Sequence, residues 1–103
     1  MSRPVIVIAR VRIRPEARTI FLDALRICIA ETRREAGCIR YDMHESVTDP
    51  DHFVFVEEWR DRAAIDAHMI AAHFRTTMSI AAPCLAEPPV VEGIEGGDRW
   101  RIM

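Results

Sequence analysis

The sequence lacks several features that would assign a function directly. Its three cysteines, Cys28, Cys38 and Cys84, are an odd number and form neither a CxxC pair nor a zinc-ligand spacing. We interpret them as small buried hydrophobic residues, with a nucleophilic cysteine as the alternative. Residues 93–97 (GIEGG) lack the phosphate-binding motif and the helix that should follow it, so no nucleotide or flavin site is expected.

Long hydrophobic runs and signal sequences are also missing. No apolar run is long enough to span a membrane, and the N-terminus has no signal-peptide pattern. The formal net charge is −2 and the basic residues do not form one block, so neither nucleic acid nor a membrane is an expected partner. We therefore expect a cytoplasmic protein.

Length and composition indicate one domain that covers residues 1–103. Of these 103 residues, 50% are hydrophobic and 29% are charged, which is ordinary for a globular domain. The core is expected at residues 5–94. A short C-terminal tail that contains Trp100 is expected at residues 95–103.

Hydrophobic periodicity predicts four strands and two helices, the second of them broken. The predicted elements are a strand at Val5–Ile13, a helix at Glu16–Ala36, strands at Cys38–Val47 and Phe53–Trp59, a helix capped by Asp61, a continuing or separate helix at His73–Leu85, and a strand at Val90–Ile94. The order β-α-β-β-α-β is the α+β, ferredoxin-like pattern with an antiparallel sheet. Helices on one side leave the other sheet face bare, and the first strand is apolar on both faces. A second copy is therefore expected to cover that face, which gives a homodimer.

The same periodicities place individual side chains. Gly37 is expected to end the first helix as a left-handed C-cap, and Glu35 is expected at the solvated end of that helix. The predicted buried positions on the first helix are Ala17, Phe21, Ala24, Leu25, Cys28 and Thr32, and those on the later helices include Ala64, Ile65, His68, Met69, Ala72, Phe74, Thr77, Met78 and Ala81. Ile39, Tyr41, Met43 and Val47 are expected to share one face of their strand.

Glu57 is the first candidate for chemistry. It shares a strand face with Phe53, Phe55 and Trp59. A carboxyl group among aromatic rings loses hydration, which should raise its pKa and let it exchange protons near neutral pH. The alternative is an ionised Glu57 paired with an arginine of the first strand, Arg10 or Arg12.

His68 and His73 are the second and third candidates. His68 lies on the apolar stripe of its helix and is expected to face the sheet that carries Glu57 and Trp59, so the three side chains could converge on one apolar pocket. The alternative for His68 is a core histidine, and His73 either lines the mouth of the pocket or caps a helix. Their spacing of five is not the i,i+4 arrangement that places two imidazoles on one metal ion, and no HExxH motif is present, so no metal is expected.

Aromatic residues complete the predicted pocket. Trp59 is interpreted either as core packing or as the wall against which a flat aromatic substrate stacks. Tyr41 and Met43 lie on the neighbouring strand and could extend that wall. His44 points to the other face, towards solvent or a subunit contact.

The sequence resembles the antibiotic biosynthesis monooxygenase domain family, which includes quinol monooxygenases. The resemblance covers Val5 to about Ile94 and rests on the segments Ala9–Glu16, Thr32–Ser46, Asp49–His68 and His73–Arg75. It implies a ferredoxin-like domain that dimerises through its sheets into an α/β barrel. Several members oxygenate phenols or quinols without a metal or flavin, so the resemblance implies no cofactor. It implies a small aromatic substrate and O2 as partners.

The resemblance also implies roles for individual residues. Glu57, Trp59, His68 and His73 would be the family's pocket residues, with His68 or Glu57 removing a phenolic proton, and Trp59 and His73 contacting the substrate. We expect Tyr41, Phe55 and Met78 to contact the substrate as well. One branch of the family degrades haem, but Ala9, His68 and Met78 replace the residues used there, so haem degradation is not expected. A related member isomerises a phosphorylated sugar.

Three hypotheses therefore follow from the sequence. The first is a cofactor-independent monooxygenase that acts on a small aromatic quinol or phenol. The second is an isomerase of a small ketone, lactone or phosphorylated sugar, which needs no oxygen. The third is a dimer that binds a ligand without catalysis.

Overall fold

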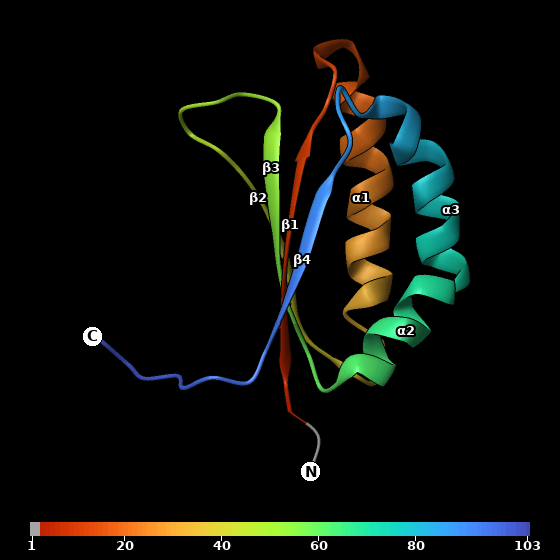
Figure 1. Cartoon of the computed structure of the whole chain (residues 1–103). Helices are drawn as coiled ribbons and strands as arrows, with labels where there is room; N and C mark the ends of the chain where they lie inside the picture. Colours follow the sequence, from red (N-terminus) through yellow and green to blue (C-terminus); the bar gives the residue numbers. More distant parts are fainter. Residues whose placement is uncertain (1–2) are drawn as a thin grey trace.

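The computed structural model describes residues 3–103 and has two layers, a four-stranded antiparallel sheet and a layer of helices (Figure 1). The elements are β1 Val5–Arg12, the 3-10 helix η1 Pro15–Ala17, α1 Arg18–Thr32, β2 Cys38–Glu45, β3 His52–Trp59, α2 Arg62–Ile70, α3 Ala72–Ala81, the 3-10 helix η2 Ala82–Cys84, and β4 Val90–Glu95. The predicted order of strands and helices and the predicted α+β class are confirmed, and the second helix is indeed broken.

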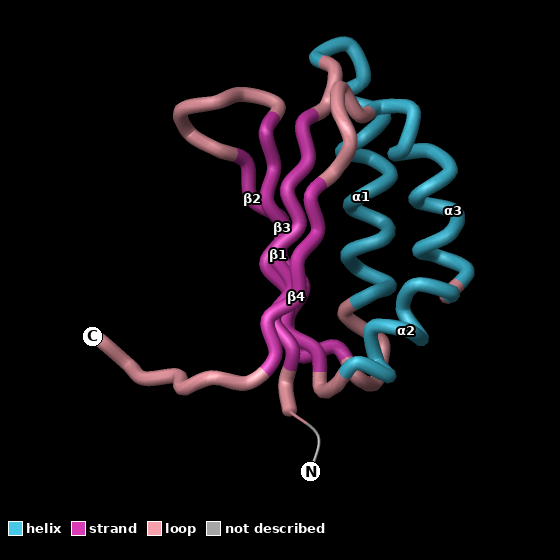
Figure 2. The backbone as a smooth tube through the Cα atoms, viewed as in Figure 1, coloured by secondary structure: helices cyan, strands magenta, loops and turns pink. Residues whose placement is uncertain are grey.

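The sheet has the strand order β2-β3-β1-β4, and all neighbouring strands are antiparallel. All three α-helices cover one face of it, as the backbone trace also shows (Figure 2). Odd-numbered residues of β1 point to the helices, and Val5, Val7 and Ala9 are buried there. The stripe predicted for the first helix is buried as expected, at Ala17, Phe21, Ala24, Leu25, Cys28 and Thr32.

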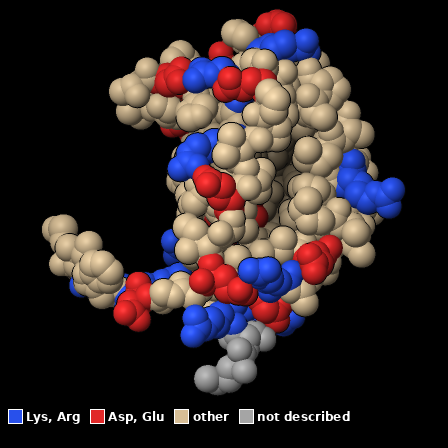
Figure 3. All heavy atoms as spheres, viewed as in Figure 1, with Lys and Arg blue, Asp and Glu red and all other residues tan. Residues whose placement is uncertain are grey.

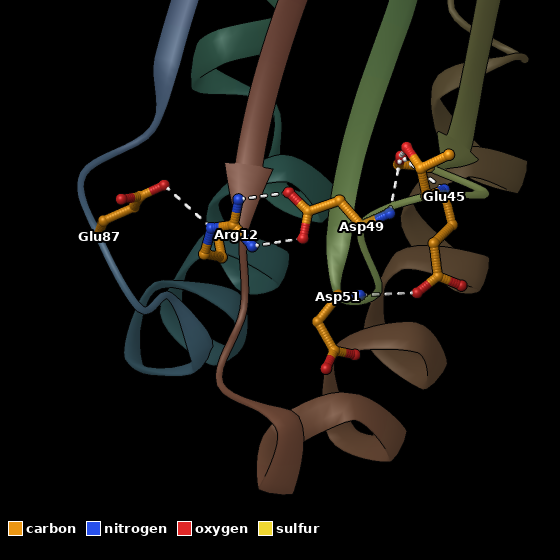
Figure 4. A network of polar contacts seen from close by, with 7 residues as sticks. Arg12, Glu45, Asp49, Asp51 and Glu87 are labelled. Atoms are coloured by element: carbon orange, nitrogen blue, oxygen red, sulfur yellow. Dashed lines mark hydrogen bonds and ion pairs between the residues drawn. The ribbon is translucent and has the colours of Figure 1, made fainter.

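Two ion-pair groups hold the turn between β2 and β3 in place. The guanidinium of Arg12 donates to both carboxylate oxygens of Asp49 over 2.9 and 2.6 Å, and its Nε lies 3.4 Å from Glu87 on the chain that leads to β4 (Figure 4). In the second group, Arg18 on α1 pairs with Glu45, whose Oε2 also accepts the backbone N–H of Asp51 over 2.9 Å. The turn is therefore tied to β1, to α1 and to the segment before β4.

The prediction for Gly37 is wrong in its mechanism. Among the described residues, the glycines with positive φ are Gly96 and Gly97, so Gly37 is not a left-handed cap. Instead it is buried against α2, where an added Cβ would overlap the Cβ of Ala64 and lie 3.4 Å from its Cα. Gly37 is therefore needed because two backbones approach closely.

Several side chains differ from the expected burial. Met69, Met78 and Ala72 are exposed, whereas His68 on α2 and Thr77 and Ala81 on α3 are buried as expected. Ile39 is 57% exposed because a bulge between Cys38 and Arg40 leaves it as the extra residue of β2. Val47 lies in the turn after β2 and is fully exposed.

The second face of the sheet is not covered by any described element. The register places Ile6, Ile8, Val56 and Ile94 on it, and Ile94 is 55% exposed. The tail that begins at Gly96 leaves the sheet on this side and extends away from the body (Figure 1). Its Trp100 is 73% exposed.

Charged side chains do not form a patch of one sign on the face seen in Figure 3, where acidic and basic groups lie next to each other. Ion pairs of the described residues include Arg10–Glu92 and Arg62–Glu95, at 3.3 and 3.1 Å. Within residues 3–103, no helix is both long enough and apolar enough to cross a membrane.

Candidate functional site

The candidate site lies between the sheet and the break in the helical layer. Strand β3 alternates, so Phe55, Glu57 and Trp59 point to the helices, and Tyr41 on β2 points the same way because it pairs with Glu57. Trp59 is fully buried, and Tyr41, Glu57 and Phe55 are 4, 7 and 7% exposed. The ring of Tyr41 lies 6.0 Å from that of Phe55 and 6.1 Å from that of Trp59. These four predicted residues therefore form one buried cluster.

Glu57 is bonded to its neighbour on the same strand face. The indole Nε1–H of Trp59 donates to Oε1 of Glu57 over 2.8 Å. Burial raises the pKa of Glu57 to about 7, against the smaller opposing effect of this hydrogen bond. Arg10 and Arg12 lie on the opposite face of the sheet and pair with other acids, so the alternative of an arginine-paired Glu57 is wrong.

His68 on α2 lies over this cluster and is 3% exposed. The centre of its ring is 4.7 Å from that of Trp59, 5.5 Å from that of Tyr41 and 4.5 Å from that of Phe74 on α3. Burial lowers the pKa of His68, and the hydrogen bond and charge of Glu35 oppose that effect only in part. His68 is therefore a neutral imidazole at pH 7.

Glu35 connects the two histidines. One of its oxygens, Oε2, lies 2.8 Å from Nδ1 of His68 and 2.8 Å from Nε2 of His73. Because a carboxylate oxygen only accepts, both imidazole nitrogens carry the proton in this arrangement. The proton of neutral His68 is thus on Nδ1, and its Nε2 carries a lone pair.

The break at Ala71 explains how the two histidines meet. Ala71 has φ −64° and ψ 143°, which is extended backbone, so α2 ends before it and α3 begins after it. His68 lies in the last turn of α2 and His73 in the first turn of α3. A spacing of five that would separate two side chains on one continuous helix therefore brings these two to the same carboxylate.

Met78 is the one predicted site residue that lies away from this cluster. It is 37% exposed on α3, and its neighbour Thr77 is buried in its place.

Burial also raises the pKa of the Tyr41 phenol, with the charge of Glu57 as the next cause, so Tyr41 stays protonated at neutral pH.

Two surface cavities lie away from this cluster. One of about 420 Å³ lies between α1 and β2 beside Arg33 and Met43. The other, of about 970 Å³, lies between the tail and the uncovered sheet face beside Ile94 and Trp100. Neither is lined by Glu57, Trp59 or His68, because the rings of the candidate site pack against one another.

Glu35 was expected at the solvated end of the first helix, and that prediction is wrong. Its side chain is only 17% exposed, in the bend between α1 and β2. The sequence did contain a signal for its burial. Thr32 follows Cys28 by four residues and Glu35 follows Thr32 by three, so Glu35 continues the buried stripe of α1.

Comparison with known proteins identifies the family. Residues 4–79 match the model of the antibiotic biosynthesis monooxygenase family, which is more than half of the chain. The chain belongs to this family. The residues of the match include Tyr41, Glu57, Trp59, His68 and His73, so the whole cluster lies within the family domain.

Three relatives resemble the chain over most of its length. "Putative monooxygenase Rv0793" of Mycobacterium tuberculosis is 37% identical over 91 residues, which are 88% of this chain and 89% of that protein. "Putative monooxygenase YcnE" of Bacillus subtilis is 32% identical over 80 residues, 78% of this chain and 84% of that protein. The protein sll1783 of Synechocystis is 30% identical over 89 residues, and the chain spans only 60% of its length.

Solved structures have the same fold. The structure of Rv0793 superposes with a TM-score of 0.87 at 34% identity and covers 93% of this chain and 97% of that one. A crystal structure described as an antibiotic biosynthesis monooxygenase has a TM-score of 0.87 at 36% identity and covers 91% of this chain and 99% of that one. These likenesses confirm the family resemblance and the ferredoxin-like fold.

Proposed function

We propose that this protein is a cofactor-independent monooxygenase that oxidises a small aromatic quinol or phenol with O2. Two relatives that are 32 and 37% identical carry the name monooxygenase, and the chain shares their family. The quinol or phenol substrate is proposed from the resemblance to quinol monooxygenases of the same family. Its flat ring would stack on the aromatic side chains of the site once Phe74 has moved.

The orientation of His68 carries this proposal. Glu35 holds Nδ1–H of His68 at 2.8 Å, so the lone pair is on Nε2, and the ring lies among Trp59, Tyr41 and Phe74. A neutral imidazole with a fixed tautomer is a suitable general base, and a carboxylate that binds its other nitrogen stabilises the imidazolium formed when it takes a proton. His68 would be the base, and Glu35 would position it.

The proposed reaction uses the substrate as its own reductant. His68 Nε2 takes the phenolic proton, and the electron-rich anion passes one electron to O2. The two resulting radicals combine to form a carbon–oxygen bond, and the peroxide receives a proton. Loss of the ring hydrogen as a proton with cleavage of the O–O bond then leaves a carbonyl and releases water. A phenol plus O2 gives a quinone plus water, and a quinol plus O2 gives a hydroxyquinone plus water, so atoms and electrons balance without a cofactor.

Glu57 would supply or accept the second proton. Its pKa of about 7 means that both protonation states are present near neutral pH. Its hydrogen bond to Trp59 Nε1–H fixes the carboxyl group beside the indole. An apolar enclosure would keep bulk water from the peroxide and radical intermediates.

Substrate access would require movement of Phe74. This half-buried residue in the first turn of α3 packs against His68, with the two rings tilted and their centres 4.5 Å apart. A change of its side-chain rotamer would uncover the His68 ring from the side where His73 is partly exposed. His73 would then line the entrance.

Oxygen uptake with a series of hydroquinones, naphthohydroquinones and phenols tests the proposal. We expect uptake of one O2 per substrate consumed and incorporation of one labelled oxygen atom from ¹⁸O2 into the product. Replacing the general base in His68→Gln should reduce kcat/KM by roughly 10²- to 10⁴-fold. Glu35→Gln should reduce it less, because the glutamine side chain can still accept the hydrogen bond.

The control for these variants is Asp66→Asn, because Asp66 is an exposed residue of α2 that lies outside the cluster and outside the uncovered sheet face. It should leave the rate unchanged. The proposal would be refuted if no substrate of these classes consumed O2 above the uncatalysed rate, or if His68→Gln oxidised them as fast as the unmodified chain.

A second candidate function is supported by the presence of two proton-transfer groups. Glu57, with a pKa of about 7, and neutral His68 both reach the same cluster and could move a proton between two carbons of a ketone, lactone or phosphorylated sugar. Such an isomerase would exchange a substrate carbon hydrogen with deuterated water under anaerobic conditions. The monooxygenase would convert its substrate only when O2 is present.

The uncovered sheet face supports the proposal of a homodimer. Ile6, Ile8, Val56 and Ile94 form an apolar row on that face, and a second copy of the chain could cover it symmetrically. Size-exclusion chromatography with light scattering should give twice the mass of 11.8 kDa. A single-chain mass at micromolar concentration would contradict the dimer.

A further inference from the structure

Three potential metal ligands meet at the junction of three elements. Glu35 comes from the bend after α1, His68 from the last turn of α2 and His73 from the first turn of α3. One carboxylate oxygen and two imidazole nitrogens, Oε2, Nδ1 and Nε2, all lie within 4.8 Å of one another. This is the only such group of three or more histidine, cysteine or acidic residues found in the described part of the chain.

The charge of Glu35 distinguishes it from the other half-buried acids. Asp49 and Asp51 each have an arginine within ion-pair distance. Glu35, by contrast, has the two imidazoles as its ion-pair partners among residues 3–103. A cation between the three side chains would give this carboxylate the full positive charge that the arginines give the other acids.

We propose that Glu35, His68 and His73 form a binding site for a divalent transition-metal ion of the zinc type. Two imidazoles and one carboxylate are a common protein ligand set for such ions, and they leave at least one coordination position for water or another ligand. Binding of the ion does not depend on the proposed oxygenase reaction, and the test below does not use turnover.

Binding requires the three ligand atoms to rearrange. Tetrahedral coordination with bonds of about 2.0–2.1 Å separates neighbouring ligand atoms by about 3.3 Å. The two nitrogens now lie 2.8 Å from the carboxylate oxygen, so each nitrogen–oxygen pair must open by about half an ångström. The two nitrogens lie within 4.8 Å of each other and must come to about 3.3 Å. Glu35 lies in a bend and His73 is partly exposed, so both can adjust while the buried His68 stays fixed.

The ion would shift two protons to the other nitrogens of their imidazole rings. In its absence, the N–H groups of His68 Nδ1 and His73 Nε2 donate to Glu35; with the ion, both nitrogens present their lone pairs to it. The proton of His68 must then be on Nε2. If the proposed function is correct, the ion removes the base lone pair from His68, so the metal-bound protein should be inactive as an oxygenase.

Tryptophan fluorescence can report the binding directly. The chain has two tryptophans, and the Trp100→Phe variant leaves only Trp59, whose ring centre is 4.7 Å from that of His68. Trp59 is fully buried, so free metal ions in solution should hardly quench it, whereas a bound Co²⁺ or Ni²⁺ ion should quench it strongly. Calorimetry of the metal-free full chain with Zn²⁺ should give one ion per chain.

Matched variants decide whether the three residues are the ligands. His73→Ala and Glu35→Gln should each weaken Zn²⁺ binding by at least about tenfold. His44→Ala should leave the affinity unchanged, because His44 is exposed on the other face of the sheet. Circular dichroism and thermal melting of the metal-free variants check that each one is folded.

Two results would overturn the proposal. The first is the absence of both heat and Trp59 quenching at millimolar metal. The second is binding that His73→Ala and Glu35→Gln leave intact, which would place the ion elsewhere on the surface. Oxygen uptake is measured separately, so a failed oxygenase assay with retained Zn²⁺ binding would refute only the proposed function.

Discussion

Replacing Glu57 with glutamine is expected to change how the stability of the protein depends on pH. Glutamine has nearly the shape of glutamic acid and keeps an oxygen that can accept the Trp59 Nε1–H, which now lies 2.8 Å from Glu57 Oε1. It cannot ionise. The difference in stability between the two proteins therefore isolates the cost of charging this buried group.

The sign and size follow from the pKa. Burial raises the pKa of Glu57 from 4.5 to about 7 in the folded protein, with the charge of Glu35 as a further cause in the same direction. Between these pH values the unfolded chain loses the Glu57 proton while the folded chain keeps it, so stability falls as pH rises. At about 1.4 kcal/mol for each pH unit, this interval corresponds to about 3 kcal/mol.

Urea unfolding of both proteins at pH values from about 4 to about 8 provides the measurement. The free energy of unfolding of the unmodified chain, minus that of Glu57→Gln, should be constant below about pH 4.5, fall by about 3 kcal/mol up to about pH 7, and then level off. Other groups, including His68, titrate in both proteins and should largely cancel. A difference that stays flat across this range would refute the buried, protonated Glu57.

Two further predictions concern the segment that positions the site. Gly37→Ala should destabilise the protein by roughly 1–3 kcal/mol, because the new Cβ would overlap that of Ala64. Adding Ala64→Gly should recover part of this loss in thermal melts. If the two substitutions instead lowered the stability by the sum of their separate effects, the contact would be contradicted. Asp61→Ala should cost about 1 kcal/mol, since the Asp61 carboxylate accepts the Ala64 N–H over 2.9 Å as the N-cap of α2. Asp66→Ala, at an exposed position of the same helix, is the control and should change stability little.

The fold was predictable because its signals are local. Successive side chains of a strand point to opposite faces, so every second residue of Val5–Arg12 and of His52–Trp59 lies on the helix side of the sheet. This assignment does not depend on which strands are paired. The stripe from Phe21 to Thr32 likewise needs only the helical repeat. The convergence of Glu57 and Trp59 on one face follows from the same period of two residues.

The errors arose where the regular period is interrupted. Ile39 is exposed because one extra residue in β2 shifts the alternation. Met69 is exposed one residue before α2 ends at Ile70. Gly37 was interpreted through its own backbone conformation, whereas the reason for glycine is the Cβ of Ala64, 27 residues further along the chain. Neither a bulge nor a close approach between distant segments is visible in a local pattern.

The sequence by itself determined the order of the elements, the buried faces and the family, since these depend on residue type and on spacing along one strand or helix. Only the tertiary structure decided that Glu35 meets His68 and His73. The reason is physical: an extended residue at Ala71 turns α3 away from the axis of α2, and the bend after α1 brings a carboxylate to that junction. Contacts between three separate elements depend on how those elements pack, and the residue spacing within any one element does not encode that packing.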